Sequence, residues 1–186
     1  MTGERRDGLP LSVVPPASDL DVTPPVLRTV MAQFATGITV LTANGEKAHG
    51  MTANAFTSVS LEPPMVLCCV AHTARMHDAI LGAKGFGVSV LSAEQESVAR
   101  YFTNKSRPTG MAQFEGVDWF PGRCTGAPLL AGSLAWIECE LAEVYAGGDH
   151  SIFLGNVVSA SRGAGEPLLF VEGGFHHVEP PEARSA

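Results

Sequence analysis

The 186-residue sequence predicts a mainly β protein, a closed antiparallel barrel with a few short helices at its edges. Many short β-rich segments are separated by turn signals, which is typical of barrels and sandwiches. Only a few segments have helical periodicity. Gly82, Gly85 and Gly87 have the wrong spacing for a dinucleotide-binding Gly-x-Gly-x-x-Gly motif, and they lead into a strand. A doubly wound βαβ fold is therefore not expected.

The first predicted element is a helix after Thr23, because this residue can cap a helix and prolines follow it in the first turn. Gly37 is expected to end the helix. Its apolar stripe consists of Leu27, Val30, Met31 and Phe34.

A hairpin is predicted around Asn44-Gly45, which is a strong two-residue turn signal. It joins strands at 38–43 and 49–54. The extended segment that follows the second strand is broken at Glu62-Pro63-Pro64, because proline has no backbone N–H to donate to a sheet. Further strands are predicted at 65–70, 86–91, 134–145, 151–162, 168–171 and 175–178.

Two more short helices are expected between these strands. One opens after residues 72–75 and ends at Gly82. The other begins after Ser92, with Gln95 as its capping-box partner, and runs to Phe102. Residues 104–116, rich in Gly, Pro and polar side chains, are predicted to form a lid-like loop.

Composition favours one domain over residues 23–178, between an N-terminal tail (1–22) and a C-terminal tail (179–186). Hydrophobic residues make up 45% of the chain, so we expect a homo-oligomer, a homodimer, in which part of this apolar surface is covered.

The charge pattern argues against a nucleic-acid partner, because the net charge is -7 and the 12 basic residues are scattered. No apolar run is long enough to cross a membrane. Residues 1–7 lack the apolar stretch of a secretory signal, so a cytoplasmic location is expected. The sequence has no Cys-x-x-Cys pair among its four cysteines, Cys68, Cys69, Cys124 and Cys139. These cysteines are therefore expected to be free thiols, and no metal site is expected.

Residues 50–64 are the most informative stretch, GMTANAFTSVSLEPP. Small residues allow a flat ligand to approach the backbone, and hydroxyl and amide side chains can bond ring carbonyls or phosphate oxygens. The alternative is that these hydroxyl groups satisfy only their own backbone.

Around this stretch lie FATGITVLT (34–42), PPMVLCCV (63–70), Tyr101-Phe102, GSLAWIEC (132–139) and Gly147-Gly148-Asp149-His150. In this order and spacing the chain resembles, over residues 26–178, the flavin reductase family with the FMN-binding split barrel. It is most similar to the small reductase component of two-component flavin-dependent monooxygenases. The resemblance implies a split barrel with Greek-key connections.

The resemblance also implies an NAD(P)H:flavin oxidoreductase that uses FMN or FAD with NADH or NADPH and passes reduced flavin to a separate monooxygenase. The implied flavin-site residues are Thr52, Ala53, Asn54, Ala55, Ser58, Val59, Ser60, Cys69, Val70 and Phe102. Phosphate is expected at Thr73 and Arg75, which precede a helix, with Lys105 and Arg107 as second candidates. These residues could equally be a helix cap and solvated surface charges.

His150 comes after two glycines and an aspartate in a tight turn, from which its side chain could reach over a pocket or simply be solvated. The family match implies a catalytic position beside the flavin and nicotinamide rings. Hydride transfer needs stacked rings and excluded water rather than a protein base. His72, His77, His176 and His177 lack metal-ligand spacing and are expected to be structural or surface residues.

Two other functions remain compatible with the sequence. The protein could retain its flavin and act on an organic substrate, or it could bind flavin without catalysing a reaction.

Overall fold

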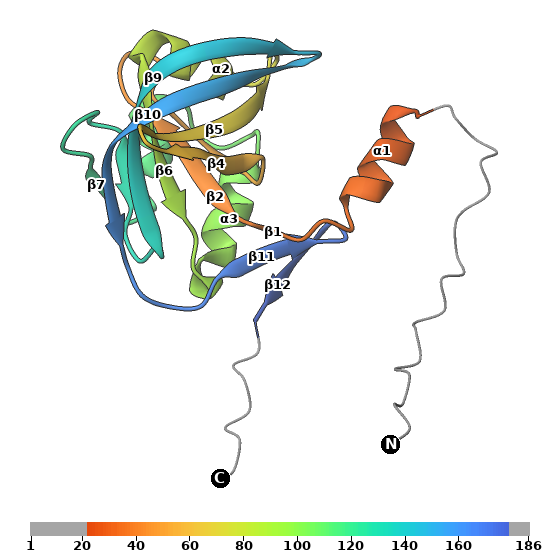
Figure 1. Cartoon of the computed structure of the whole chain (residues 1–186). Helices are drawn as coiled ribbons and strands as arrows, with labels where there is room; N and C mark the ends of the chain where they lie inside the picture. The colour runs from red at the N-terminus through yellow and green to blue at the C-terminus, as the bar shows by residue number, and fades with distance from the viewer. Residues whose placement is uncertain (1–21, 179–186) are drawn as a thin grey trace, which may run out of the picture.

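A computed structural model describes residues 22–178, and the two predicted tails lie almost entirely outside this range (Figure 1). The helical elements are α1 (Pro24–Met31), α2 (Arg75–Ala83), η1 (Ala93–Gln95), α3 (Glu96–Thr103) and η2 (Gly110–Phe114). The first strands are β1 (Thr36–Gly37), β2 (Thr39–Ala43), β3 (His49–Ala53), β4 (Phe56–Leu61), β5 (Pro64–Ala71) and β6 (Gly85–Val90). The remaining strands are β7 (Trp119–Pro121), β8 (Pro128–Leu130), β9 (Ala135–Gly147), β10 (His150–Arg162), β11 (Leu168–Val171) and β12 (Gly174–His177).

The fold is mainly β, as predicted, and its centre is a seven-stranded sheet in the order β3-β2-β6-β9-β10-β5-β4. Every neighbouring pair in this sheet is antiparallel. The long β9–β10 hairpin crosses the top of the molecule in Figure 1. Small sheets formed by β1-β11-β12 and by β7-β8 accompany the main sheet.

The two edges of the main sheet are joined by only two residues, Asn54 and Ala55, between β3 and β4. Because an extended residue spans about 3.5 Å, the edges cannot lie far apart, and the sheet must curl strongly. Within residues 22–178 no hydrogen-bonded ladder pairs β3 with β4, so a fully closed barrel is not shown.

Two hydrophobic clusters fill the interior. One lies between the sheet and α2 and includes Leu41, Met76 and Phe86. The other lies between β2 and α3 and includes Phe102 and Phe114. Together they fix α2 and α3 against the strands that carry residues 50–64.

Helix α1 differs from the prediction in its length. It ends at Met31 rather than at Gly37, because Thr36 and Gly37 pair with Phe170 and Leu169 of β11 as strand β1. The Thr23 side chain makes no capping hydrogen bond. None of the residues of α1 is buried, and the helix projects from the body (Figure 1).

The other helix boundaries agree closely with the prediction. The N-cap residue of helix α2 is Ala74, so Thr73 does not cap this helix. The helix ends at its C-cap residue Lys84, which has a left-handed conformation and lies two residues after Gly82. The predicted capping box of Ser92 and Gln95 is present. No helix within residues 22–178 is both long and apolar enough to cross a membrane.

The prediction of a lid-like loop at 104–116 is wrong for the centre of this segment. Gln113 and Phe114 are fully buried in η2, and the Arg107 side chain is buried as well. Gln113 donates hydrogen bonds to the carbonyl oxygens of Ala48 (3.2 Å) and Gly110 (2.7 Å). The bond to Ala48 holds the segment against the start of β3, and the bond to Gly110 lies within the segment.

Candidate functional site

The first of two cavities beside residues 50–64, called here the neutral cavity, has a volume of about 740 Å³. None of its lining residues is charged. It is lined by Met31, Phe34, Ala35, Thr36, Gly37, Thr39, Asn54, Ala55, Phe56, Thr57, Leu67, Cys69 and Val90. Apolar walls with a few hydroxyl and amide groups suit a largely apolar ring with polar edge atoms.

The second, called here the cationic cavity, has a volume of about 400 Å³. It is lined by His49, Met51, Thr52, Ala71, Thr73, Ala74, Arg75, Phe102, Thr103, Lys105 and Arg107. Three of these residues, Arg75, Lys105 and Arg107, have positively charged side chains, and no Asp or Glu is among the described lining residues. This arrangement favours an anionic group, such as a phosphate.

The two cavities meet along β5, where Cys69 lines the neutral cavity and Ala71 the cationic one. On the neighbouring segment Thr52 of β3 lines the cationic cavity, and Asn54, which follows β3, lines the neutral one. Residues two apart along an extended strand point to the same face. An elongated ligand with a ring at one end and an anionic group at the other could therefore occupy both cavities.

Of the predicted site residues, Ala53 and Val70 line neither cavity, whereas Thr52 and Phe102 belong to the wall of the cationic cavity. Ala53 and Val70 are buried in the core. The Thr52 hydroxyl group donates to the Ala99 carbonyl oxygen at 2.7 Å, so its hydrogen is committed to α3. Phe102 is almost fully buried, and its ring forms part of the wall of the cationic cavity.

Ser58, Val59 and Ser60 lie outside both cavities. Ser58 and Val59 are exposed on β4, next to a register shift opposite β5. The Ser60 hydroxyl group accepts a hydrogen bond from the Glu62 amide at 3.1 Å, so it satisfies the local backbone. In a single chain these three residues therefore do not meet the other predicted site residues.

Thr73 and Arg75 flank the start of α2 at the cationic cavity. The N-cap residue between them is Ala74, which has no polar side-chain atom to accept hydrogen bonds from the first-turn amides. These amides and the positive end of the helix dipole therefore add to the electropositive character of this wall.

His150 begins β10, where it pairs with Gly147 of β9 and Ala71 of β5. Its Nδ1 atom lies 2.8 Å from Asp149 Oδ1, and this hydrogen bond and the imidazole charge lower the pKa of Asp149. Ala71 lines the cationic cavity, but His150 itself lines neither cavity.

The structure adds His49 and buries Arg107, two features that the residue pattern did not indicate. Arg107 Nη2 lies 3.0 Å from His49 Nε2. Burial, together with the positive charges of Arg107 and Arg75, lowers the pKa of His49 to about 4. His49 is therefore neutral at physiological pH.

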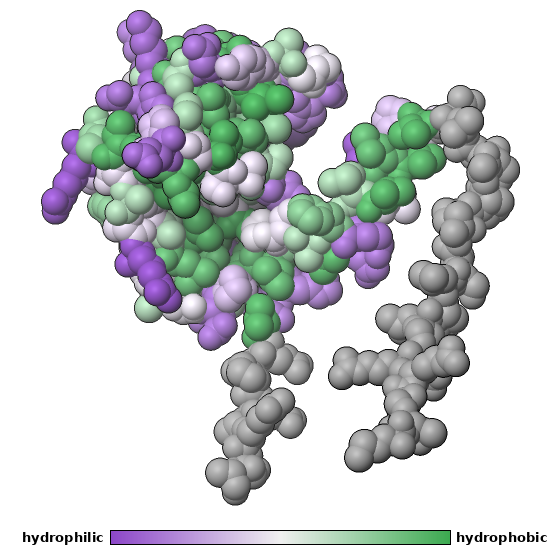
Figure 2. Space-filling view, viewed as in Figure 1, coloured by the Kyte–Doolittle hydropathy of each residue, from purple (hydrophilic) through white to green (hydrophobic). Residues whose placement is uncertain are grey.

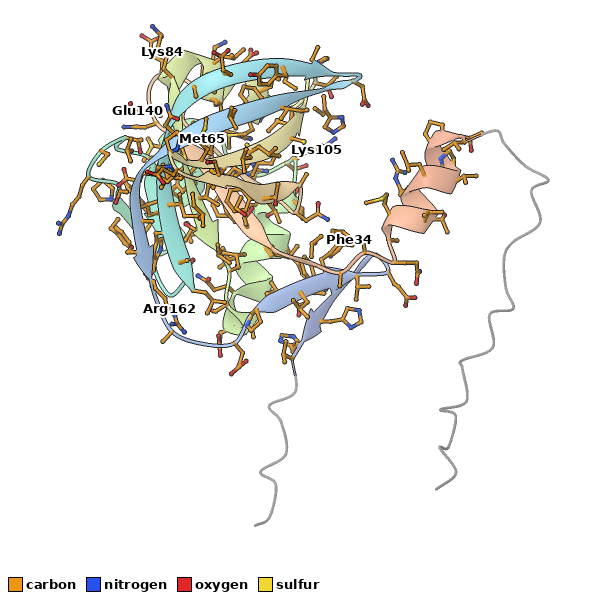
Figure 3. All side chains as sticks on the ribbon, in the orientation of Figure 1. Phe34, Met65, Lys84, Lys105, Glu140 and Arg162 are labelled. Carbon is orange, nitrogen blue, oxygen red and sulfur yellow. The ribbon has the colours of Figure 1, made fainter. Side chains whose placement is uncertain are left out.

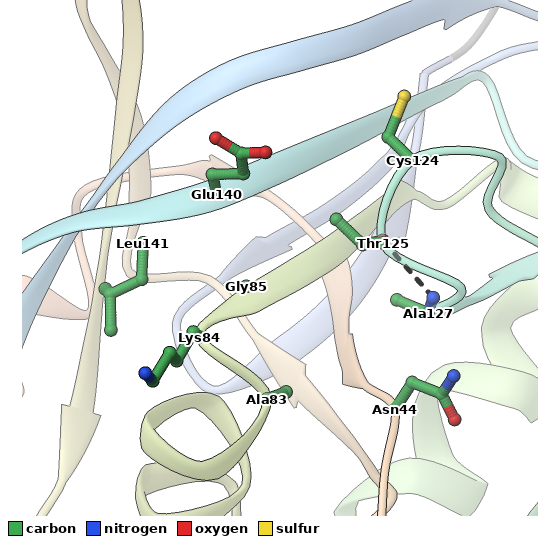
Figure 4. A pocket seen from close by; sticks show the side chains of 9 residues that line it. All are labelled: Asn44, Ala83, Lys84, Gly85, Cys124, Thr125, Ala127, Glu140 and Leu141. Atoms are coloured by element: carbon green, nitrogen blue, oxygen red, sulfur yellow. Dashed lines mark hydrogen bonds between the residues drawn. The ribbon is translucent and has the colours of Figure 1, made fainter.

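Another cavity, of about 400 Å³, contains none of the predicted site residues (Figure 4). It lies near Lys84 and Glu140, on the side of the molecule away from Phe34 and Lys105 (Figure 3). The one hydrogen bond that Figure 4 marks between the residues drawn, from the Ala127 amide to Thr125 Oγ1 (3.2 Å), is internal to one loop. We therefore place the candidate site at the neutral and cationic cavities.

The described residues contain no cluster of metal-ligating side chains, and the two buried cysteines, Cys68 and Cys139, are not activated thiols. No group of three or more His, Cys, Asp or Glu side chains gathers within residues 22–178. Burial raises the pKa of the Cys68 thiol, and raises that of Cys139 to about 12. Neither thiol is therefore a nucleophile at neutral pH.

The fold and these cavities define a mainly β protein with one neutral and one cationic cavity, a pairing that suits a ring-bearing anionic ligand. Comparison with known proteins specifies the class: the chain belongs to the family of the flavin reductase like domain, whose model matches residues 31–179. The chain is 49% identical over 178 residues to the NADH-dependent FAD reductase of Streptomyces globisporus, with 94% of this chain and 98% of that protein covered.

Two further comparisons point to the same family. A reductase subunit, HsaB, of a flavin-dependent monooxygenase from Mycobacterium tuberculosis is 37% identical over 169 residues, covering 89% of this chain and 88% of that protein. The crystal structure of BorF, the flavin reductase component of a bacterial two-component tryptophan halogenase, matches with a TM-score of 0.80 and 46% identity. That match covers 84% of this chain and 98% of BorF.

A structure with ligands is also similar. The NADH:FAD oxidoreductase SgcE6 of Streptomyces globisporus, in complex with NAD and FAD fragments, matches with a TM-score of 0.80 and 48% identity. The match covers 86% of this chain and 94% of that chain.

Proposed function

We propose that this protein is an NADH-dependent flavin reductase that reduces FMN or FAD and releases the reduced flavin to a separate flavin-dependent oxygenase or halogenase component. The observation that carries this proposal is the pair of cavities along one strand face, one neutral and one cationic. The relatives named NADH-dependent FAD reductase and monooxygenase reductase subunit support the reaction and the cofactor.

A flavin nucleotide fits the chemistry of both cavities. The isoalloxazine ring would occupy the neutral cavity, where Asn54 offers an amide to its polar edge and Cys69 and Phe56 offer apolar contact. The small side chain of Ala55 lets the ring lie close to the backbone. The phosphate would occupy the cationic cavity, held by Thr73, Arg75 and Lys105, while Thr52 and Phe102 keep the wall in place.

A bound flavin supplies an acceptor atom that takes a hydride from NADH. The protein's own part is to orient the two rings face to face and to exclude water. No described side chain in either cavity is placed as a base with a nucleophile, which agrees with a reaction that needs none in the hydride step. We propose that His150 positions the nicotinamide or stabilises charge on the reduced ring, held in orientation by Asp149.

We also propose that the protein is a homodimer. Helix α1 carries five exposed large apolar side chains on or just after it, and none of its residues is buried. Figure 2 shows this apolar surface on the projecting helix and on the face of the body beside it. A second copy that covers this surface would also cover Phe34 and Met31 at the mouth of the neutral cavity. Ser58, Val59 and Ser60 could then meet a ligand or the second copy.

Three finer expectations are retained as proposals. The curled sheet, whose edges are linked by Asn54 and Ala55, supports a split β-barrel. A single domain over residues 23–178 is consistent with the two adjoining cores. A cytoplasmic location, where NADH is available, stays a prediction.

One assay separates this function from its alternatives. Purified protein is mixed with NADH and excess FMN or FAD, and absorbance at the nicotinamide band is followed. Multiple turnovers without another substrate support a flavin reductase. If only one equivalent of tightly held flavin is reduced and further NADH oxidation requires an organic substrate, a flavin-retaining oxidoreductase is favoured. Flavin binding without NADH oxidation would favour a binding protein. Repeating the assay with NADPH tests the preference for NADH.

A further inference from the structure

We propose that Arg107 is a pre-oriented anchor for the phosphate of the flavin nucleotide and that His49 is the residue that positions it. This inference rests on the proposed function, because it assigns the flavin as the source of the anion. It gives a definite role to Arg107, which the sequence indicated only as a second candidate for the phosphate, and to His49, which the sequence did not single out.

Arg107 is a buried cation without an anionic partner. Only 9% of the residue is exposed, and no salt bridge to it is found within residues 22–178. Its hydrogen-bond partners are all neutral: the carbonyl oxygens of Asn104 and Gly50, Gln113 Oε1 and His49 Nε2. Burial lowers the pKa of Arg107, as expected for a cation that has lost water without gaining a counter-ion.

Arg107, which lines the cationic cavity, keeps one hydrogen-bond donor without a partner among residues 22–178. A guanidinium group has five N–H donors. Four are engaged: one on Nε, one of the two on Nη1 and both on Nη2. One donor on Nη1 therefore remains, on a side chain that lines the cavity with Arg75 and Lys105. A phosphate there would neutralise the buried charge and accept this donor.

His49 fixes the direction of the guanidinium group. Because Arg107 can only donate, the His49 Nε2 atom at 3.0 Å must be the acceptor, and the imidazole must carry its proton on Nδ1. Protonation of His49 would replace this acceptor with a second positive charge. The lowered pKa of His49, about 4, is consistent with the neutral form.

Gln113 also holds the Arg107 side chain in place. Its Oε1 atom accepts from the Gly50 amide at 2.9 Å and from Arg107 Nε at 3.4 Å. The Arg107 guanidinium carbon also lies 5.6 Å from the centroid of the Phe102 ring. The side chain is thus held from several directions before any ligand arrives, which lowers the entropy that binding must remove.

The test compares FMN with riboflavin, which has the same ring but no phosphate. Dissociation constants for both are measured by flavin fluorescence titration for the wild-type protein and for Arg107→Met. We expect FMN to bind about tenfold to a hundredfold more weakly to the variant, the effect of one charge-assisted hydrogen bond. Riboflavin affinity should change less than about threefold. Arg162→Met, which changes an exposed arginine far from Lys105 in Figure 3, is the matched control and should alter neither.

Two substitutions at position 49 test the positioning role. His49→Leu removes the acceptor and should reduce the FMN preference over riboflavin by about tenfold, while His49→Gln, whose amide oxygen can accept from Arg107, should retain most of it. A merely structural role would lower FMN and riboflavin affinity together in both variants. Should Arg107→Met fail to fold, Arg107→Lys keeps the charge without the planar fork and should still weaken FMN selectively.

The outcomes separate this inference from the proposed function. If the wild-type protein binds FMN and riboflavin equally, or if the Arg107 and His49 variants keep the wild-type FMN preference, the inference is wrong even when NADH oxidation proceeds. If the wild-type protein oxidises no NADH but binds FMN through Arg107, the proposed reductase function fails and the anchor stands.

Discussion

Gly50 lies directly against the Phe102 ring. A Cβ atom at position 50 would stand 2.5 Å from Phe102 Cε1 and 3.2 Å from Phe114 Cζ. The glycine at the start of residues 50–64 is therefore required by the packing of α3 and η2 on β3. This contact couples the core to the wall of the cationic cavity.

Gly50→Ala should destabilise the protein and displace that wall. Overpacking a core position typically costs about 1–3 kcal/mol, and the Phe102 ring that must give way lines the cationic cavity and packs on Phe114. We expect a lower melting temperature and weaker FMN binding. Gly82→Ala is the control, because a Cβ there meets no atom within 4 Å and alanine favours α2. A Gly50→Ala protein as stable as the wild type would contradict the packing account.

Glu138 is predicted to make a pH-dependent contribution to stability. It is buried, and its carboxylate accepts hydrogen bonds from the amides of Arg123, Cys124 and Thr125 and from the Thr125 hydroxyl group. Burial alone would raise the pKa of Glu138, but these donors outweigh burial and lower it. The stabilisation is therefore present above the unfolded-state pKa of about 4.3 and is lost as the pH falls through the lower folded-state value.

Glu138→Gln tests this contribution. The substitution turns one acceptor oxygen into an NH₂ group that faces backbone donors, at a cost of about 1.5–3 kcal/mol in the free energy of unfolding at pH 7. The difference from wild type should shrink as the pH falls below about 4. Urea unfolding from pH 3 to pH 7 measures it. Glu140→Gln, an exposed change on the same strand, should have almost no effect at any pH. A constant difference across this range would rule out the carboxylate as its source.

The strands were predictable because their signals are local. Alternation along β9 and β10, the Asn44-Gly45 turn and the capping box of Ser92 with Gln95 all act within a few residues. The end of α1 was missed because Gly37 pairs with Leu169 of β11, and nothing near Gly37 encodes that distant partner.

The lining of the two cavities was predictable in part of its residue types but not in its arrangement. The sequence indicated Thr52, Asn54 and Arg75, yet their division between two cavities depends on how β3 and α2 meet in space. Arg107 was only a second candidate for the phosphate, and its burial was not predictable because its partner Gly50 is 57 residues away. Ser58 shows the converse case: it was expected in the site but is exposed, because a hydroxyl-rich pattern does not reveal which face of a strand is covered.

The exposed face of α1 predicts dimerisation. Leu27→Asp combined with Val30→Asp should convert the protein to a monomer while changing the stability of each chain by about 0.5 kcal/mol or less, because both side chains are more than half exposed in one chain. Sedimentation velocity measures the oligomeric state. Thr29→Asp, on an exposed position of the same helix, serves as the control and should leave the dimer intact. A wild-type protein that is monomeric at micromolar concentration would refute this interface.

His150→Ala should separate catalysis from binding. The residue lines neither cavity, so its removal should leave the FMN dissociation constant within about threefold of wild type. At the end of the β9–β10 turn it pairs with Ala71 at the edge of the cationic cavity, and Asp149 holds its ring at 2.8 Å. If it positions the nicotinamide or stabilises the reduced ring, NADH oxidation at saturating FMN should slow by about tenfold or more, equivalent to about 1.4 kcal/mol of transition-state stabilisation. His176→Ala, an exposed histidine on β12, is the control and should keep the wild-type rate. An equal loss of FMN affinity and rate in His150→Ala would instead assign His150 to the binding site, and an unchanged rate would remove it from the reaction.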